Sequence, residues 1–411
     1  MTSNTLLDFT EAKALIFEQA KAINHRQSEL INLDKALNRI VAKPILSPMN
    51  VPSFNNSAMD GYAIRLEDLN KSSTLPVGGT VLAGQADLLW KQNSCLRIMT
   101  GAPVPDDADA VVMQEHVEIN GDHIAFNVAD IKKGQNIRYK GESVKKDDIV
   151  CNVGEKLTIP KLSTLATLGL TKINVFKPLK VALFSTGDEL VSIGEQFTHS
   201  NQIFDSNRFT LSLMLKSLGC DVVDLGILKD DLSTIANTLK AVSNDVDIII
   251  TSGGVSVGDA DYTKKAVSSI GEVNFWKIAM KPGKPFAFGK INKALFCGLP
   301  GNPVSSFVTF YQLVRPLIFK LNGNGEATKV KYISMRCTSN LKKSKGRIDF
   351  QRGYVYPNDI NELVVKSSGA QGSHITSASD HANCFIVLEK DRGNVMAGEW
   401  VNVEFFDSTL L

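Results

Sequence analysis

Three glycine-rich segments between residues 248 and 303 carry the residue types that bind phosphate or a similar anion. They read Thr-Ser-Gly-Gly-Val-Ser-Val-Gly-Asp-Ala-Asp (251–261), Lys-Pro-Gly-Lys-Pro (281–285) and Gly-Leu-Pro-Gly-Asn-Pro (298–303). Glycine lets a turn aim successive backbone N–H groups at one point, which suits a phosphate. The lysines supply positive charge, and the aspartates are candidate ligands of a divalent cation. Together the segments predict an anion-binding site at the carboxyl ends of parallel strands.

The lysine segment is the most specific of the three. Two prolines fix the turn around Gly283, so Lys281 and Lys284 lose less conformational entropy when they bind an anion. A solvated run of lysines is the alternative, but two prolines in five residues are unusual in a segment that serves only solubility. Lys277, four residues earlier, is a candidate third lysine of the site.

The segment Ser-Thr-Gly-Asp-Glu-Leu (185–190) follows an apolar run and is a second candidate for phosphate or ribose binding. Thr186 and the backbone of Gly187 can donate to phosphate oxygens, and Glu189 can accept hydrogen bonds from hydroxyl groups. A plain strand-to-loop turn with Gly187 at positive φ explains the same residues, and both interpretations stay open.

Adjacent carboxylates at Asp230 and Asp231 follow another apolar strand. Such a pair can hold Mg²⁺ beside phosphates, and Asp261 can turn back to the same strand end. Asp231 is equally suited to cap a helix that begins at Leu232. In the N-terminal half, Asp60 and Thr100 lie in polar glycine-containing loops, where a turn role is again the alternative. The six histidines, His374 among them, lack metal-ligand spacing and are predicted to be ordinary residues.

Length and composition limit the functional class. A chain of 411 residues is expected to form two to four domains, and 43% hydrophobic with 21% charged residues is ordinary for globular proteins. The net charge of +2 gives no field that would indicate nucleic acid. The six scattered cysteines favour buried reduced thiols. Because no signal peptide or membrane-length apolar run is present, we expect a cytoplasmic protein without a membrane partner.

The elements that position these residues follow from apolar periodicity. Predicted helices cover 8–23, 34–39, 160–169, 207–218, 232–242 and 304–321. Predicted strands cover 60–65, 95–99, 110–113, 123–126, 181–184, 221–227, 246–251, 332–335, 384–388 and 400–405. Strands of 178–326 are apolar without alternation, which indicates burial on both faces and hence a parallel sheet. The apolar residues on 304–321 serve either core packing or a two-fold contact.

The predicted fold is multidomain α/β plus β. A central parallel α/β domain spans 178–326, and a β domain spans 47–146. Residues 1–46 and 147–177 are expected to form a discontinuous helical linker domain, in which 160–169 packs on the first helices and which carries the β domain as an insert. A C-terminal β-barrel is expected over 327–411.

Nine segments of the chain resemble the molybdopterin molybdenumtransferase family, which includes the C-terminal domain of the scaffold protein gephyrin. They occur in the family's order and span nearly the whole chain, which is too much agreement for chance. The segments are S-A-M-D-G-Y-A (57–63), M-T-G-A-P-V-P (99–105), S-T-G-D-E-L (185–190), D-S-N-R (205–208), G-G-V-S-V-G-D-A-D-Y (253–262), K-P-G-K-P-F-A-F-G (281–289), G-L-P-G-N-P-V-S (298–305), F-Q-R-G (350–353) and Q-G-S-H (371–374).

The resemblance implies a reaction and a fold. Enzymes of this family insert molybdate into adenylylated molybdopterin, release AMP and require Mg²⁺, with a central domain of the molybdopterin-binding type. The related enzyme that adenylylates molybdopterin shares this domain but carries G-G-T-G in the glycine loop. Here the loop reads Gly253-Gly254-Val255-Ser256, and the chain has additional β domains, so the metal-inserting enzyme is the better match.

The resemblance also implies roles for single residues. The predicted molybdate site comprises Lys281, Lys284, Pro285, Ser305, Arg352 and Ser373. The predicted phosphate and nucleotide site comprises Thr186, Gly253, Gly254, Ser256 and Lys277. The predicted catalytic residues are Asp60, Thr100, Glu189 and Asp261, with Mg²⁺ held by Asp261 and by Asp230 or Asp231. One departure is Ser143, where the family pattern has Asp; Glu142 beside it is the alternative acidic residue.

Family members are homodimers whose cleft combines domains of both chains, and the same assembly is expected here. Expected protein partners are the molybdopterin adenylyltransferase and apo-molybdoenzymes. Two other functional classes compete. A nucleotide-dependent enzyme of another chemistry is disfavoured because the chain lacks both the dinucleotide fingerprint and the P-loop. A non-catalytic scaffold is disfavoured because it would have no need of the aspartates and lysines together.

Overall fold

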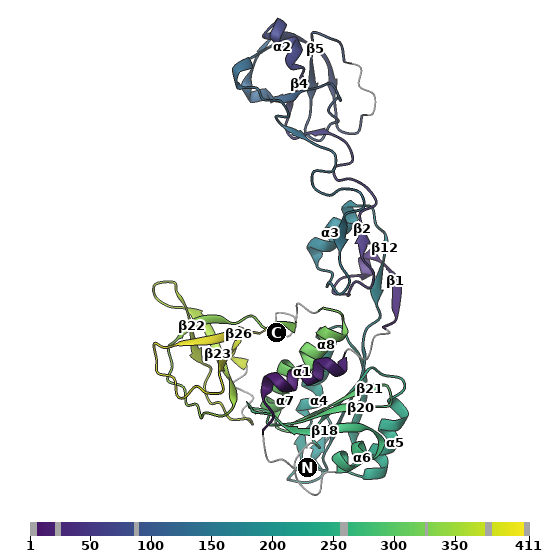
Figure 1. The fold of residues 1–411 in the computed structure, drawn as a ribbon, viewed down its shortest axis with the longest axis vertical. Helices are drawn as coiled ribbons and strands as arrows, with labels where there is room; N and C mark the ends of the chain where they lie inside the picture. The colour runs from purple at the N-terminus through teal and green to yellow at the C-terminus, as the bar shows by residue number, and fades with distance from the viewer. Residues whose placement is uncertain are drawn as a thin grey trace.

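The computed structural model of this protein describes residues 6–20, 26–85, 90–254, 262–324, 328–374 and 380–406. Figure 1 shows an elongated molecule with an α/β unit and a β-barrel at one end and a separate β unit at the other. A narrow segment containing α3 (Ile159–Thr167), β2 (Ile45–Leu46) and β12 (Lys172–Phe176) joins the two ends. This arrangement confirms the predicted fold class.

A six-stranded sheet forms the centre of the α/β unit. Its strands, in spatial order, are β16 (Asp221–Leu228), β13 (Lys180–Thr186), β17 (Ile248–Ser252), β21 (Ala294–Leu299), β20 (Pro285–Ile291) and β18 (Glu272–Lys277). The first four are parallel, as predicted, whereas β21, β20 and β18 pair antiparallel. The expectation of an entirely parallel sheet is therefore wrong at this edge, where short connections favour antiparallel neighbours.

Helices cover both faces of this sheet. Alternate residues of β13 face opposite sides: Val181 and Leu183 belong to one core cluster, and Ala182 and Phe184 to another. The first cluster includes residues of α4 and of the helix that follows β21; the second includes residues of α5 and α6. The helices are α4 (Ser206–Ser217), α5 (Leu232–Val242) and α6 (Tyr262–Ile270). Burial on both faces explains the unbroken apolar runs of these strands.

The helix predicted over 304–321 is present and contains a π-helical segment. It consists of α7 (Pro303–Thr309), the π segment Phe310–Val314 and α8 (Arg315–Leu321). Phe310, Tyr311 and Val314 are fully buried within the chain, so core packing, rather than a two-fold contact, accounts for them. α1 (Phe9–Ala20) packs against α8 and into the same core.

The packing of α1 corrects one expectation about the linker. The segment 160–169 does form a helix, α3, but its core contains Ala36, Val41, Cys151, Leu165 and Val175 and no residue of α1. Two short antiparallel pairs accompany it: β1 (Ser28–Asn32) with β12, and β2 with β11 (Ile149–Cys151). The predicted helix at 34–39 is a single 3₁₀ turn, Leu33–Lys35. α1 is instead buried by its apolar face against the α/β unit.

The β unit at the far end is a six-stranded sheet. Its order is β7 (Ala110–Met113), β4 (Gly61–Ile64), β6 (Cys95–Ile98), β5 (Thr74–Val81), β9 (His123–Phe126) and β8 (Val117–Asn120), with α2 (Leu66–Lys71) beside it. A short antiparallel pair flanks this sheet in the sequence: β3 (Asn56–Ser57) precedes β4, and β10 (Ile137–Arg138) follows β9. Asp60 directly precedes β4, and Thr100 follows β6, so neighbouring strands bring these two residues together.

The C-terminal barrel closes because β23 pairs with both β24 and β25. Its strands are β23 (Ile348–Pro357), β24 (Leu363–Ser367), β22 (Ile333–Cys337), β26 (Trp400–Phe405) and β25 (Cys384–Leu388). A buried polar group joins the barrel to the long helix: Glu404 accepts hydrogen bonds from Gln312 at 2.7 Å and Arg315 at 3.1 Å. Burial raises the pKa of Glu404, while both partners oppose that shift.

All six cysteines are buried and free, which confirms the expectation of reduced thiols. None of the described helices has the length and apolar character needed to cross a membrane.

Candidate functional site

The lysine segment lies in the connection between two strands of the central sheet, and part of this connection pairs with a strand of the barrel. β18 and β20 are paired from Glu272–Lys290 to Lys277–Pro285, and the connection between them forms the short strand β19 (Met280–Lys281). β19 pairs in parallel with β23 of the barrel, with Lys281 opposite Asp349. The hydrogen bond from Ile278 N to Lys284 O, 2.7 Å, closes the loop. The loop is therefore fixed by both the central sheet and the barrel.

Gly283 is the one position of this loop that only glycine satisfies. Its φ is +102°, and a Cβ atom there would lie 2.3 Å from Oγ1 of Thr309 on α7. A residue with a side chain would be strained at this positive φ and would collide with α7. The glycine thus allows the lysine loop to lie directly on α7.

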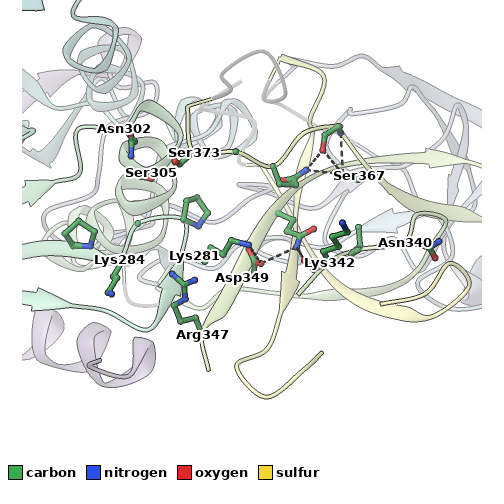
Figure 2. A pocket seen from close by; sticks show the side chains of 18 residues that line it. Lys281, Lys284, Asn302, Ser305, Asn340, Lys342, Arg347, Asp349, Ser367 and Ser373 are labelled. Atoms are coloured by element: carbon green, nitrogen blue, oxygen red, sulfur yellow. Dashed lines mark hydrogen bonds and ion pairs between the residues drawn. The ribbon is translucent and has the colours of Figure 1, made fainter. Parts of the chain in front are cut away.

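A cavity of about 760 Å³ lies between this loop and the barrel (Figure 2). Five of the six predicted molybdate residues line it: Lys281, Lys284, Pro285, Ser305 and Ser373. The barrel adds two cations and an amide that the sequence interpretation missed, namely Lys342, Arg347 and Asn340. These three residues belong to no recognisable sequence motif. They line the cavity only because the barrel packs against the lysine loop.

The two lysines differ in their electrostatic surroundings. The Nζ atom of Lys281 lies 3.4 Å from Oδ2 of the buried Asp349, as Figure 2 shows. That carboxylate also accepts from Gln351 Nε2 at 3.2 Å. Lys284 makes no ion pair with any described residue, and its side chain is exposed. Lys284 is therefore the less neutralised cation of the pair and the stronger candidate for binding an anion.

Arg352 is the exception among the predicted molybdate residues. Its side chain is only 1% exposed, and it does not line the cavity. Its guanidinium donates to the carbonyl oxygens of Ala370 at 3.0 Å, Gln371 at 3.3 Å and Gly372 at 3.2 Å. In this structure Arg352 holds the loop leading to Ser373, and its Nε atom has no hydrogen-bond partner among the described residues.

A second cavity, of about 680 Å³, adjoins the first. Its lining includes Thr186, Gly253 and Gly254 of the predicted phosphate site, together with Glu189, which was predicted to be catalytic. His374, predicted to be an ordinary residue, lines it as well. The two cavities share Pro285, Asn302 and Ser305 in their linings. They are therefore neighbouring parts of one cleft.

The glycine loop after β17 has a steric requirement of its own. Gly253 and Gly254 have φ values of +88° and +65°. A Cβ atom on Gly254 would lie 2.3 Å from Oγ1 of Thr263 and 3.0 Å from Oγ1 of Thr186. The two hydroxyls are themselves 3.3 Å apart. Glycine thus leaves room for the threonine hydroxyls beside the exposed backbone, a surface suited to a phosphate.

The structure describes two of the three predicted magnesium ligands, Asp230 and Asp231. Asp231 caps α5: its carboxylate accepts from Thr234 N at 2.7 Å and Ser233 Oγ at 2.6 Å. Hydrogen bonds from Ser233 and Thr234 lower the pKa of Asp231 to about 2. Asp231 is therefore engaged as the N-cap of α5, and Asp230 is the other predicted carboxylate of the pair. Asp261 and Ser256 lie outside the described residues. Within the described chain, no cluster of three His, Cys, Asp or Glu residues could hold a metal ion.

Asp60 and Thr100 form a pair of their own. Asp60 Oδ1 accepts from Thr100 N at 2.7 Å and Thr100 Oγ1 at 2.8 Å. These hydrogen bonds, the backbone one first, hold the pKa of Asp60 below its usual range. Figure 1 shows the strand β4, which Asp60 precedes, at the end of the molecule away from the central sheet. Within one chain the pair therefore does not join the cleft.

Lys277 of the predicted phosphate site and the departure at Ser143 both lie outside the cleft. Lys277, on β18, lines neither cavity. Ser143 lies next to Glu142 in the connection between β10 and β11, where Glu142 accepts from Tyr139 N at 2.8 Å. Glu142 thus has a local structural role.

Comparison with known proteins decides the family. A family described as the probable molybdopterin binding domain matches residues 182–320. The MoeA N-terminal region (domain I and II) matches residues 7–169, and the MoeA C-terminal region (domain IV) matches residues 334–406. A protein of Haemophilus influenzae named molybdopterin molybdenumtransferase is 51% identical over 407 residues, which cover 98% of this chain and 100% of that relative. The chain belongs to the molybdopterin molybdenumtransferase family.

More distant relatives agree with this assignment. A gephyrin of Dictyostelium discoideum is 33% identical and aligns with 97% of this chain and 62% of its own length. A crystal structure of the molybdopterin biosynthesis MoeA protein of Pyrococcus horikoshii OT3 superposes with a TM-score of 0.84 at 27% identity, covering 98% of this chain and 100% of that one. The resemblance predicted from the nine segments is confirmed, and with it a role in molybdenum cofactor biosynthesis.

The contact between Gly283 and α7 leads to a prediction for this molybdenumtransferase family member. Gly283→Ala should lower the free energy of unfolding by about 1–3 kcal/mol, because the alanine is strained at positive φ and overpacks Thr309. Denaturant unfolding measures the effect. Gly393→Ala is the matched control, because a Cβ atom there meets no atom within 4 Å. Equal stability of the two variants would contradict the steric role of Gly283.

Proposed function

We propose that this protein inserts molybdate into adenylylated molybdopterin and releases AMP. The observation that supports this most directly is the shared wall of the two cavities, formed by Pro285, Asn302 and Ser305. A cationic compartment for an oxyanion thereby adjoins a glycine-lined compartment for phosphate. A substrate whose phosphate lies in one can present its dithiolene to an anion held in the other.

In the proposed reaction, the phosphoanhydride bond between the pterin phosphate and AMP is hydrolysed, and the dithiolene sulfurs replace oxygen atoms of molybdate. Lys284 binds the molybdate dianion, and Lys281 shares its charge between molybdate and Asp349. The backbone of Gly253 and Gly254 binds the phosphates. Asp60, whose carboxylate is held by two hydrogen bonds from Thr100, acts through hydrogen bonding or charge.

The assay that tests this proposal is AMP release from adenylylated molybdopterin in the presence of molybdate and Mg²⁺. We expect wild-type protein to release AMP and Lys284→Ala to need more molybdate. Losing one charge-assisted hydrogen bond costs about 1.5–3 kcal/mol, so the Kd for molybdate should rise about 10- to 100-fold. Binding of the adenylylated pterin should be nearly unchanged.

Lys290→Ala is the control for Lys284→Ala, because Lys290 is an exposed lysine at the other end of β20 and lines neither cavity. If Lys284→Ala weakened both ligands equally, the lysine would belong to the nucleotide compartment. If wild-type protein released no AMP at all, the proposed reaction would be wrong.

We also propose that Mg²⁺ is required and that Asp261 and Asp230 hold it. The ion would offset negative charge on the pyrophosphate, a role that one or two carboxylates commonly support. Asp230→Ala should raise the Mg²⁺ concentration that gives half-maximal AMP release. Asp231→Ala should leave that concentration unchanged and lower the melting temperature, because α5 loses its N-cap. The reverse pattern would assign the metal to Asp231.

The position of Asp60 supports a further proposal, that the active protein is a homodimer with each cleft completed by the partner chain. Asp60→Ala and the double variant Lys281→Ala/Lys284→Ala should then complement one another. Random subunit exchange leaves one intact site in each mixed dimer, so activity should return to about a quarter of wild type. Exchange that mass spectrometry verifies but that restores no activity would contradict a shared site.

We place this reaction in the cytoplasm, between two other proteins. The adenylyltransferase that makes the substrate and the apo-molybdoenzymes that take up the product are the proposed partners. Co-purification with either, retained after a salt wash, would support transfer by direct contact.

A further inference from the structure

Asp60 lies where three neighbouring strands of the β unit meet. In the sheet, β4 lies between β6 and β7 and is antiparallel to both. Asp60 directly precedes β4, Thr100 follows β6, and Gln114 follows β7. The start of β4 and the ends of its two antiparallel neighbours share one edge of the sheet. Asp60 is therefore flanked by groups from both sides.

The two neighbours hold different parts of Asp60. On the β6 side, Thr100 donates twice to the carboxylate oxygen Oδ1. On the β7 side, Gln114 N donates to Asp60 O at 3.1 Å. The next residue, Gly61, lies so close to β7 that a Cβ atom on it would be 2.0 Å from Val112 O. The other carboxylate oxygen, Oδ2, accepts no hydrogen bond from a described residue and can bond to a further group.

Arg97 connects these two sides. It lies on β6 opposite Tyr62 of β4, and its guanidinium carbon is 5.0 Å from the centroid of the Tyr62 ring. Its Nη1 atom donates to Gly61 O at 3.2 Å, and its Nη2 atom donates to Gln114 Oε1. One side chain thus links β6, the residue after Asp60 and the residue whose N–H holds the Asp60 carbonyl.

The contacts of Arg97 exceed what a purely stabilising cation needs. Contact with the Tyr62 ring alone would supply a cation–π interaction across the strands. Both hydrogen bonds of the guanidinium instead end on neutral groups next to Asp60, and Arg97 makes no ion pair with any described residue. The hydrogen bonds from Thr100 and, after them, the charge of Arg97 lower the pKa of Asp60.

Building on the proposed function, we propose that Arg97, acting through Gly61 and Gln114, is a positioning residue that fixes the Asp60 carboxylate for the reaction in the partner's cleft. Because Thr100 occupies Oδ1, Oδ2 is the oxygen that reaches the reacting groups. A carboxylate supplied by a neighbouring chain meets those groups only if its own backbone is fixed. Misplacement by about 1 Å can cost about 100-fold in rate. Arg97 itself need not touch the substrate.

The first test is amide hydrogen exchange of the full-length protein, which needs no activity. Arg97→Gln should speed exchange of the Thr100 and Gln114 amides, the two that donate to Asp60, about threefold to tenfold, the effect of one lost hydrogen bond. Amides of the ladder between β5 and β9, on the other side of the sheet, should exchange as in wild type. Faster exchange throughout the sheet would give Arg97 a merely structural role and overturn the proposal.

Arg65→Gln is the matched control. Arg65 belongs to the same β unit, and its guanidinium carbon is 3.6 Å from the centroid of the Trp90 ring, but it bonds to neither Asp60 nor Gln114. This variant should lower the melting temperature without a selective change at the Thr100 and Gln114 amides. Selective change in the control equal to that in Arg97→Gln would contradict the proposal.

The second test is the kinetics of AMP release. Arg97→Gln should lower kcat about 10- to 100-fold and leave KM for the adenylylated pterin unchanged, since Arg97 acts only through Asp60. A raised KM with normal kcat would show that Arg97 binds the substrate directly and would overturn the inference, as would unchanged exchange of both amides. Absence of AMP release by wild type would overturn the proposed function, while the exchange data would still decide whether Arg97 fixes Asp60.

Discussion

The cleft depends on a loop that belongs to two sheets. The connection between β18 and β20 is anchored in the central sheet at both ends, and in between it pairs with β23 of the barrel. This pairing sets Lys281 against the buried Asp349 and leaves Lys284 exposed. Movement of the barrel would therefore move the lysines. The contact between the α/β unit and the barrel thus sets the position of the lysines relative to the phosphate compartment.

The long helix after β21 holds this junction together. Its first turn contributes to both compartments, because Ser305 lines the lysine cavity and the phosphate cavity. Its later turns carry Gln312 and Arg315, whose hydrogen bonds to Glu404 hold the barrel. Removing one hydrogen-bond partner of a buried carboxylate strongly destabilises a protein. The contacts of Glu404 therefore favour a single arrangement of helix and barrel. Substrate compartments and domain contact thereby share one rigid element.

Much of the fold was predictable because its signals are local. Apolar runs and helical periodicity identify β13, β17, α5 and the long helix almost to the residue. Strands β18 and β20 were missed, because their antiparallel edge carries no distinct local pattern beside the lysine loop. The docking of α1 was also wrong, since an amphipathic helix fits any apolar surface and its sequence does not say which one.

The sequence by itself determined the family, the glycine loops and the identity of the lysine pair, because short motifs with steric or charge requirements are readable without a structure. Only the tertiary structure decided which residues meet. It brought Arg347 into the lysine cavity, turned Arg352 into a support for a loop, and assigned Asp231 to a helix cap. Side-chain role depends on what lies across the space between elements. The distance between facing elements is set by how the barrel, the long helix and the central sheet pack, and no local sequence pattern encodes it.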